Sequence, residues 1–240
     1  MALMRWLLGW LVVVGLLPAS VWLAWLVLAS VEFGYGYWYP ALAIDEHIAE
    51  FAPENRFGRD EFVDTSEAER RRLFAEIAAF VDGRRGEDAL ERLSYRDPDG
   101  EPLGLLLRGQ ERAHLQDVRD LVAQWRPWGA GAAAGVGIVL ATLLVLRQPL
   151  PRPRAALAFW GGTASLIGIA VVLHGLMPTY RLLHEWAFPA GAPWFFYYQD
   201  SLLTTLTKAP DLFLAIGAVW GMLTVGLYVA IYAACRRVLR

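Results

Sequence analysis

Hydrophobic residues along the chain gather in four long blocks, and most of the polar residues lie between the first two. The blocks cover about residues 6–30, 128–146, 155–177 and 212–235, and the first contains no charge. A bilayer core about 30 Å thick needs about 20 apolar residues in a helix. The pattern therefore predicts an all-α membrane protein with four transmembrane helices and a largely helical extracytoplasmic domain between the first and second.

The same pattern divides the chain into three parts. We expect the first transmembrane helix within 1–31, the extracytoplasmic domain over 32–127, and helices two to four over 128–240 with an interfacial outer loop at 178–211. The first block is roughly 25 residues long, whereas the hydrophobic region of a secretory signal is about 7–15. A retained anchor is favoured over a cleaved signal peptide.

Arginines in the short connections predict the orientation of these helices. They precede the first block, fill the connection between the second and third, and follow the fourth: Arg5; Arg147, Arg152 and Arg154; Arg236, Arg237 and Arg240. Short cytoplasmic segments carry an excess of Lys and Arg. The prediction is a multi-pass protein of the bacterial cytoplasmic (inner) membrane with both termini in the cytoplasm.

Charge and composition exclude several function classes. Residues 31–127 hold 21 of the 24 acidic residues against 13 arginines, which indicates an acidic, solvated domain, and no block is basic enough to bind nucleic acid. The single cysteine, Cys235, allows neither an internal disulfide nor a redox pair. Neither a serine nucleophile elbow nor a Gly-rich phosphate loop occurs, which favours acid–base chemistry over an acyl-serine mechanism if the protein is an enzyme. No soluble cofactor is expected.

Local signals predict the elements of the polar domain. Thr65 or Ser66 before acidic residues is typical of a helix start, and a helix to about Val81 follows. The sequence DPDG at 97–100 indicates a turn. The aromatic run at 33–39 resembles an interfacial belt. His47, in a polar stretch, is expected to be solvated.

A second amphipathic helix is predicted over about 109–125, and it carries the first candidate site. At about 100° per residue, Glu111 and His114 fall inside its apolar stripe, and Asp117 lies at the border. Buried ionisable groups are costly unless paired, and a cluster of them often marks a functional site. The stripe therefore favours a site at these three residues.

The connection at 178–211 contains the second candidate site. His184 and Glu185 precede an unusually aromatic stretch that includes Trp186, Phe188 and Trp194. Irregular backbone at membrane depth must be buried in protein or line a cavity, so His184 is expected to share an outer cavity with His114. Zinc held by the two histidines with an acidic residue is a competing interpretation, although the spacing is not diagnostic. His174, within the third block, is a further candidate.

Small residues recur at four-residue spacing in two of the blocks. Gly131 and Gly135 lie in the second block, and Gly217 and Gly221 lie in the fourth. Such pairs let helices approach closely in lipid. We expect them to mark packing surfaces.

Both candidate sites resemble motifs of a known family. The run from Glu111 to Val118, ERAHLQDV, resembles the E-x-x-H-[LM]-x-D-V motif of the DUF1461 membrane-protein family. The run HEWAF at 184–188, followed by Trp194, Ser201 and PDLF at 210–213, resembles that family's second motif. The resemblance covers roughly residues 60–240, and the four-helix layout also fits.

The resemblance implies a reaction, since characterised members are lipoprotein intramolecular transacylases. These move the sn-2 acyl chain of a diacylglyceryl-modified lipoprotein to the α-amine of its N-terminal cysteine, giving the lyso-form. Membrane phospholipid is the other expected partner, and neither a metal nor another cofactor is expected. A non-catalytic protein that binds lipid or a lipoprotein, and a zinc-dependent hydrolase, remain alternative interpretations.

The resemblance also implies roles for particular residues. It makes His114 and His184 the functional pair. We assign proton abstraction to His114, with Asp117 or Glu111 setting its tautomer, and proton donation to His184. The expected substrate-binding residues are Tyr180, Trp186, Phe188 and Trp194.

Overall fold

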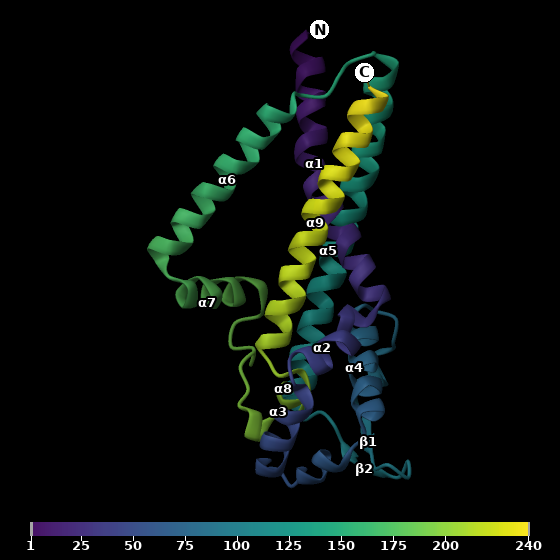
Figure 1. Cartoon of the computed structure of the whole chain (residues 1–240), viewed down its shortest axis with the longest axis vertical. Helices are drawn as coiled ribbons and strands as arrows, with labels where there is room; N and C mark the ends of the chain where they lie inside the picture. Colours follow the sequence, from purple (N-terminus) through teal and green to yellow (C-terminus); the bar gives the residue numbers. More distant parts are fainter. Residues whose placement is uncertain (1, 240) are drawn as a thin grey trace. The chain divides into compact units, whose positions relative to one another are not determined.

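The computed structural model describes residues 2–239, and most of them are helical. Among these residues, four helices are long and apolar enough to cross a membrane (Figure 1): α1 (Ala2–Ser30), α5 (Gly109–Val145), α6 (Pro153–His174) and α9 (Asp211–Val238). The prediction of an all-α membrane protein with four transmembrane helices is therefore confirmed.

Two predicted boundaries are wrong. The amphipathic helix and the second hydrophobic block form one continuous helix, α5, with Pro127 inside it. A proline removes a single N–H, and the hydrogen bonds on either side can hold a long helix together. The third block ends at His174 because Gly175 has φ +93° and ψ 147°, a conformation that is essentially restricted to glycine. A separate helix, α7 (Leu176–Ala187), follows, so the connection at 178–211 is partly helical.

The chain forms two compact units. Unit 1 comprises residues 2–25, 125–187 and 221–239 of the described chain, and unit 2 comprises residues 26–124 and 188–220. The core of unit 1 joins α1, α5, α6 and α9 through buried side chains that include Val12, Leu16, Leu143 and Ala156. Tyr228 of α9 adds polar contacts, since its hydroxyl donates to the Val13 carbonyl at 3.0 Å.

The close helix contacts in unit 1 do not lie at the predicted glycines. A Cβ on Gly131, Gly135, Gly217 or Gly221 would meet nothing within 4 Å. Instead, a Cβ on Gly129 would lie 2.5 Å from Cβ and Cγ of Trp22, and one on Gly15 would lie 2.9 Å from Val136. The partner that crowds a glycine comes from another helix, so spacing along one helix did not identify it.

Gly129→Ala is expected to destabilise the protein, whereas Gly131→Ala is not. The added methyl at position 129 has to displace Trp22, and overpacking of this kind typically costs about 1–3 kcal/mol. At position 131 the methyl meets open space, and alanine favours the helix by about 1 kcal/mol. Thermal unfolding in detergent should give a lower Tm for Gly129→Ala and an equal or higher Tm for Gly131→Ala; equal melting of both variants would contradict this packing.

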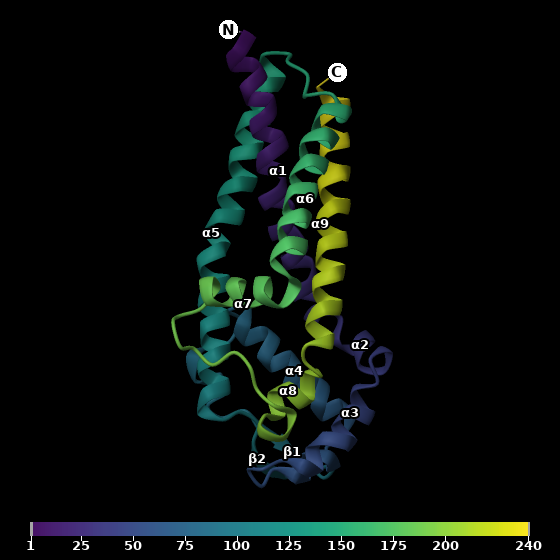
Figure 2. The ribbon, with the colours of Figure 1, turned by 90° about the vertical axis from the view of Figure 1, so that its left-hand side faces the viewer.

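Helix α6 packs against its neighbours only near its start. Phe159 contacts Trp10 edge-on, and the Trp160 Nε1–H donates to the Tyr228 hydroxyl at 3.0 Å. Beyond these turns the large side chains are exposed all round the helix, among them Leu166, Ile169 and Leu173. Figure 1 shows α6 diverging from α1 and α9, and Figure 2 shows α7 turned across the end of α6. A helix that is apolar on every face suits a lipid surrounding.

Unit 2 is built from short helices and one hairpin. Its elements are α2 (Tyr35–Ala41), α3 (Ile44–Phe51), α4 (Glu67–Val81), β1 (Ser94–Arg96), β2 (Pro102–Leu105) and α8 (Leu202–Thr207), with 3-10 turns at Glu32–Gly34, Ala52–Glu54, Asp60–Asp64, Glu87–Leu90 and Tyr198–Asp200. The Ser66 hydroxyl caps α4 by accepting from the Glu69 N–H at 3.1 Å, as the sequence predicted. The predicted turn at 97–100 joins the antiparallel strands β1 and β2.

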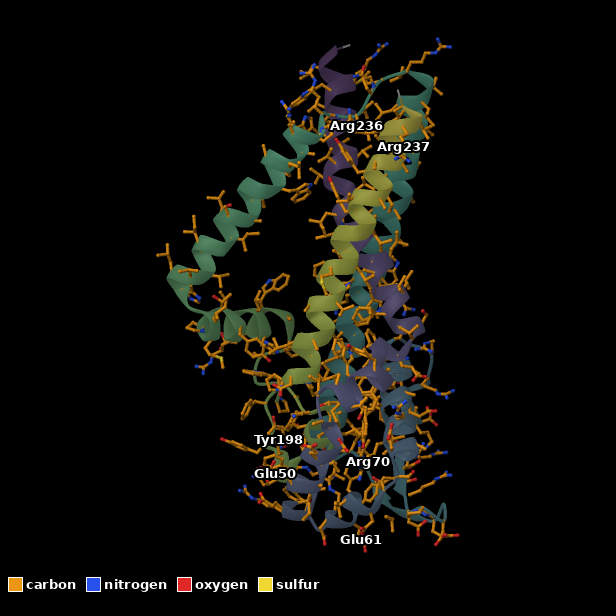
Figure 3. All side chains as sticks on the ribbon, in the orientation of Figure 1. Glu50, Glu61, Arg70, Tyr198, Arg236 and Arg237 are labelled. Atoms are coloured by element: carbon orange, nitrogen blue, oxygen red, sulfur yellow. The ribbon has the colours of Figure 1, made fainter. Side chains whose placement is uncertain are left out.

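The aromatic run at 33–39 is largely core rather than an interfacial belt. Tyr35 and Tyr39 are buried, Tyr35 stacks on Phe74 with ring centroids 4.0 Å apart, and its hydroxyl donates to the Leu206 carbonyl at 2.8 Å. The buried Arg70 guanidinium (Figure 3) donates to Tyr39, to Thr65 and to a backbone carbonyl. These bonds satisfy a charge that would otherwise be costly to bury.

The expectation that His47 is solvated is wrong. Only 6% of the residue is exposed, and its ring packs on Phe51 and Tyr198. Burial, and then the nearby Lys208, lowers the pKa of His47 to about 4. The ring is therefore neutral at pH 7 and behaves as a core aromatic residue.

Candidate functional site

The first turns of α5 place the first motif in unit 2. Glu111 is fully buried, whereas His114 and Asp117 are half-buried. Residues three apart lie on the same helix face, so the three side chains follow one another along one side of α5. This confirms that the helical stripe carries the acid inward.

Glu111 is the centre of a buried polar network. Its carboxylate accepts from the Ser201 hydroxyl at 2.5 Å, from the Arg108 N–H at 2.6 Å and from the Leu203 N–H at 3.3 Å. The Arg59 guanidinium lies 4.0 Å away and the Arg108 Nε lies 3.7 Å away. The carboxylate thereby links the start of α5 to the start of α8, segments that are 90 residues apart in sequence.

Arg59 extends this network to the backbone of two other segments. Its guanidinium donates to the Leu106 carbonyl at 2.8 Å and contacts the Asp200 carbonyl at 3.4 Å. Burial lowers the pKa of Arg59, and the charge of Glu111 opposes that shift. These hydrogen bonds offset part of the cost of removing the guanidinium from water.

Ser201 has no capacity left to act as a nucleophile. Its single proton goes to Glu111, and its oxygen accepts from both the Thr204 N–H at 3.1 Å and the Thr204 hydroxyl at 2.9 Å. A hydroxyl has one proton and two lone pairs, and the residue is fully buried. Ser201 is therefore a helix cap and a link to Glu111.

His114 lies among aromatic side chains of the segment that follows α7. Its ring centroid is 5.4 Å from that of Phe188 and 6.0 Å from that of Phe196. One turn along α5, burial and then the neighbouring Asp120 raise the pKa of the Asp117 carboxyl. Unit 2 thus gives His114 an apolar wall and places a carboxyl one turn away.

His184 belongs to unit 1, near the end of α7. Its Nδ1 lies 3.0 Å from the Tyr180 carbonyl oxygen, and the two rings are 4.1 Å apart. A carbonyl oxygen can only accept a hydrogen bond, so Nδ1 carries the proton and the neutral ring has its lone pair on Nε2. The helix backbone therefore sets the tautomer of this histidine.

The four predicted substrate-binding residues divide between the two units. Tyr180 and Trp186 lie on α7 in unit 1, and Trp186 is 73% exposed. Phe188 and Trp194 lie in unit 2 and are half-buried, with Phe188 against His114 and Trp194 against Phe195. Within the described chain, no three His, Cys, Asp or Glu side chains gather closely enough to hold a metal ion.

Arg59 and the link between Ser201 and Glu111 were not identified from the sequence. Arg59 lies in a polar loop without a motif, and its importance comes from a contact with a residue 52 positions further along the chain. Sequence could have identified Ser201 as a helix N-cap, because serine is a preferred capping residue whose hydroxyl accepts from the N–H three residues later, here that of Thr204. Only the fold shows that the cap also binds Glu111.

Comparison with solved structures identifies the fold. The membrane integral lipoprotein intramolecular transacylase Lit from Bacillus cereus superposes with a TM-score of 0.68, covering 99% of this chain and 97% of that one at 14% identity. The chain has the Lit fold. Two Lit variants with a substituted histidine, one to alanine and one to arginine, match at the same TM-score, with 14% and 13% identity and 94% and 92% of those chains covered.

The likeness to Lit is one of structure rather than sequence. No protein-family model matches this sequence, and no curated protein matches it either. The motif resemblance described above is thus accompanied by a shared fold but not by a family-model match. The shared fold and the four apolar helices together indicate that this chain is a membrane protein.

Proposed function

We propose that this protein is a lipoprotein intramolecular transacylase. The observation that carries the proposal is the Lit fold over 99% of the chain. His114 of α5 and His184 of α7 support it, since each occupies a motif that resembles the transacylase family. The substrate is a diacylglyceryl-modified lipoprotein, and the product is its lyso-form with an amide-linked acyl chain.

The reaction needs proton transfer but no external nucleophile. The α-ammonium first loses a proton, and the amine nitrogen then forms a bond to the sn-2 ester carbonyl. The ester C–O bond breaks, and the glyceryl oxygen takes up the second proton that the nitrogen loses. Amine and ester belong to one molecule, so positioning supplies much of the acceleration. A serine or cysteine nucleophile is unnecessary.

The tautomer of His184 suits it to proton abstraction. Its Nδ1–H is held on the Tyr180 carbonyl, which leaves the basic lone pair on Nε2. An orienting bond on Nδ1 serves the same purpose in Ser-His-Asp triads. We therefore assign the base to His184 and the stabilisation of the oxyanion and leaving group to His114, the reverse of the expectation from sequence.

The two acidic residues near His114 take different roles in this proposal. The groups that donate hydrogen bonds to Glu111 belong to the residue just before α5 and to the start of α8. Glu111 is therefore a positioning residue that holds the start of α5. Asp117 is the carboxyl that would set the tautomer of His114, and burial raises the pKa of that carboxyl. The substrate-binding residues would be Phe188 and Trp194 of unit 2 and Tyr180 and Trp186 of α7, whose side chains would contact the acyl chain.

The proposed setting is the bacterial cytoplasmic membrane. The arginine-rich connections favour cytoplasmic termini, with residues 32–127 and 178–211 facing outward. Diacylglyceryl-modified lipoproteins reside at that outer surface, anchored in the surrounding phospholipid.

Mass spectrometry of a lipoprotein N-terminus tests the proposal. The protein is expressed with a reporter lipoprotein in cells that lack the usual N-acyltransferase. We expect an N-acyl cysteine with one remaining O-acyl chain, whereas cells with an empty vector keep the diacyl form. Intact diacyl N-termini in the presence of the protein would refute the transacylase and favour a protein that only binds lipoprotein.

A further inference from the structure

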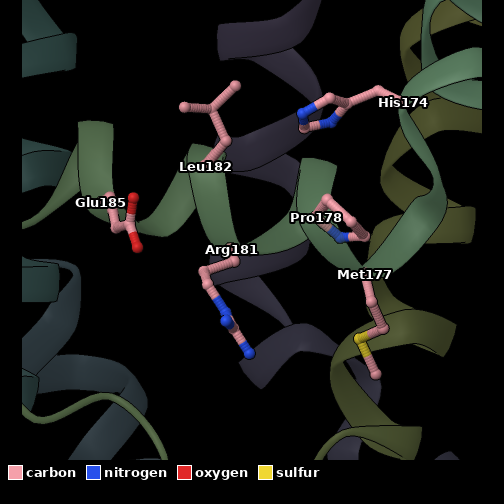
Figure 4. A pocket seen from close by; sticks show the side chains of 6 residues that line it. All are labelled: His174, Met177, Pro178, Arg181, Leu182 and Glu185. Atoms are coloured by element: carbon pink, nitrogen blue, oxygen red, sulfur yellow. The ribbon is translucent and has the colours of Figure 1, made fainter.

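A second concave site lies in unit 1, at the elbow between α6 and α7. Six side chains line a hollow of about 330 Å³: His174, Met177, Pro178, Arg181, Leu182 and Glu185 (Figure 4). Gly175 makes the elbow, because its φ of +93° turns the chain and a Cβ there would lie 3.3 Å from the Pro178 ring. The catalytic proposal uses none of these residues.

The hollow holds one unpaired charge of each sign. Arg181 and Glu185 lie one helical turn apart, yet no ion pair joins these two described side chains, and Figure 4 shows them extending in different directions. Glu185 is also the sole acidic residue among 2–25, 125–187 and 221–239, the ranges that make up unit 1. Within these ranges, the cation of a ligand can therefore find a carboxylate only at Glu185.

His174 adds a hydrogen-bond acceptor to the hollow. The Thr179 hydroxyl donates its only proton to the Gly175 carbonyl at 2.7 Å, so it accepts from His174 Nδ1 at 3.1 Å. The neutral ring consequently has its lone pair on Nε2. The lining thus combines a guanidinium, a carboxylate and an imidazole around one space.

We propose that this hollow binds the head group of a zwitterionic phospholipid with a primary ammonium, a phosphoethanolamine group. The phosphate pairs with Arg181 and the ammonium with Glu185, assisted by His174. Arg181 and Glu185 are one turn apart, with Cβ atoms about 5–6 Å apart, so these two flexible side chains can both reach a zwitterion whose charges are joined by a two-carbon bridge. A primary ammonium donates three hydrogen bonds.

The lining argues against the other common head groups. A quaternary ammonium donates no hydrogen bond and is usually held by a cage of aromatic rings, whereas His174 is the sole aromatic residue among the six lining residues. A glycerol head group has no cation for Glu185. The apolar side of α7, with Leu183 56% and Trp186 73% exposed, suits the same bilayer surface.

Lipid binding to the purified full-length protein, measured by native mass spectrometry, tests this proposal. The probes are dioleoyl-phosphatidylethanolamine and dioleoyl-phosphatidylcholine. We expect the ethanolamine lipid to bind about tenfold more tightly, since a charge-assisted hydrogen bond contributes about that factor or more. Equal affinity for the two lipids would overturn the proposal.

Two variants of exposed residues separate the two charges of the head group. Glu185→Gln should bring the affinity for the ethanolamine lipid down to that for the choline lipid, which should not change. Arg181→Gln should weaken both lipids, because both contain phosphate. Arg154→Gln, at the opposite end of α6, is the matched control and should keep the preference. A preference that survives Glu185→Gln would also overturn the proposal.

The lipid measurement does not depend on the catalytic proposal. It uses affinity for phospholipid, whereas the transacylase test uses the chemistry of a lipoprotein N-terminus. Selective lipid binding without acyl transfer would refute only the enzyme, and acyl transfer without lipid preference would refute only the head-group site.

Discussion

His114→Ala is expected to lower the rate of acyl transfer by about 10²–10⁴-fold, the usual contribution of a positioned acid–base group. The alanine cannot donate to the oxyanion or to the departing glyceryl oxygen, and no serine or cysteine step is available to replace it. Stability should change less than it would for a core residue, because the ring is only half-buried, against Phe188 and Phe196.

Initial rates with purified protein and a diacylglyceryl lipopeptide measure this effect. Gln116→Ala is the matched control on the same helix, since the Gln116 amide donates only to the neighbouring Asp120, at 2.9 Å. The Gln116→Ala control should keep the wild-type rate of acyl transfer. His184→Ala should lower that rate as much as His114→Ala does. A rate for His114→Ala equal to that of Gln116→Ala would remove His114 from the mechanism.

Glu111→Ala is expected to destabilise the protein by about 3–5 kcal/mol, the cost of breaking a buried ion pair by removing one partner. The substitution leaves the partly buried Arg59 without its counter-charge and the Ser201 hydroxyl without its acceptor. The start of α5, which carries His114, would lose its link to α8. Activity should therefore fall together with stability.

Thermal unfolding in detergent, compared with that of Glu50→Ala, measures the loss. Glu50 is exposed (Figure 3), so its removal should leave Tm unchanged. Glu111→Gln keeps the shape and the acceptor oxygen but not the charge, and it should recover part of both Tm and rate. An unchanged Tm in Glu111→Ala with lost activity would make Glu111 a catalytic rather than a positioning residue.

Local patterns predicted the parts of this protein that depend on neighbours in sequence. Four apolar blocks predicted four membrane helices because the bilayer requires a minimum length of apolar helix. Ser66 predicted a helix start because its hydroxyl reaches an N–H only three residues away. The inward position of Glu111 followed from helical periodicity, which is also local.

Contacts between distant segments were decided by the tertiary structure alone. Gly129 rather than Gly131 is the crowded glycine because Trp22 of another helix lies over it, and His47 is buried because Tyr198 packs on it. The partners of Glu111 come from residues 59, 108, 201 and 203, and no spacing rule connects all four positions. Helix geometry thus predicted from sequence that Glu111 faces inward, whereas only the packed fold determined which side chains meet it and that His47 is buried as well.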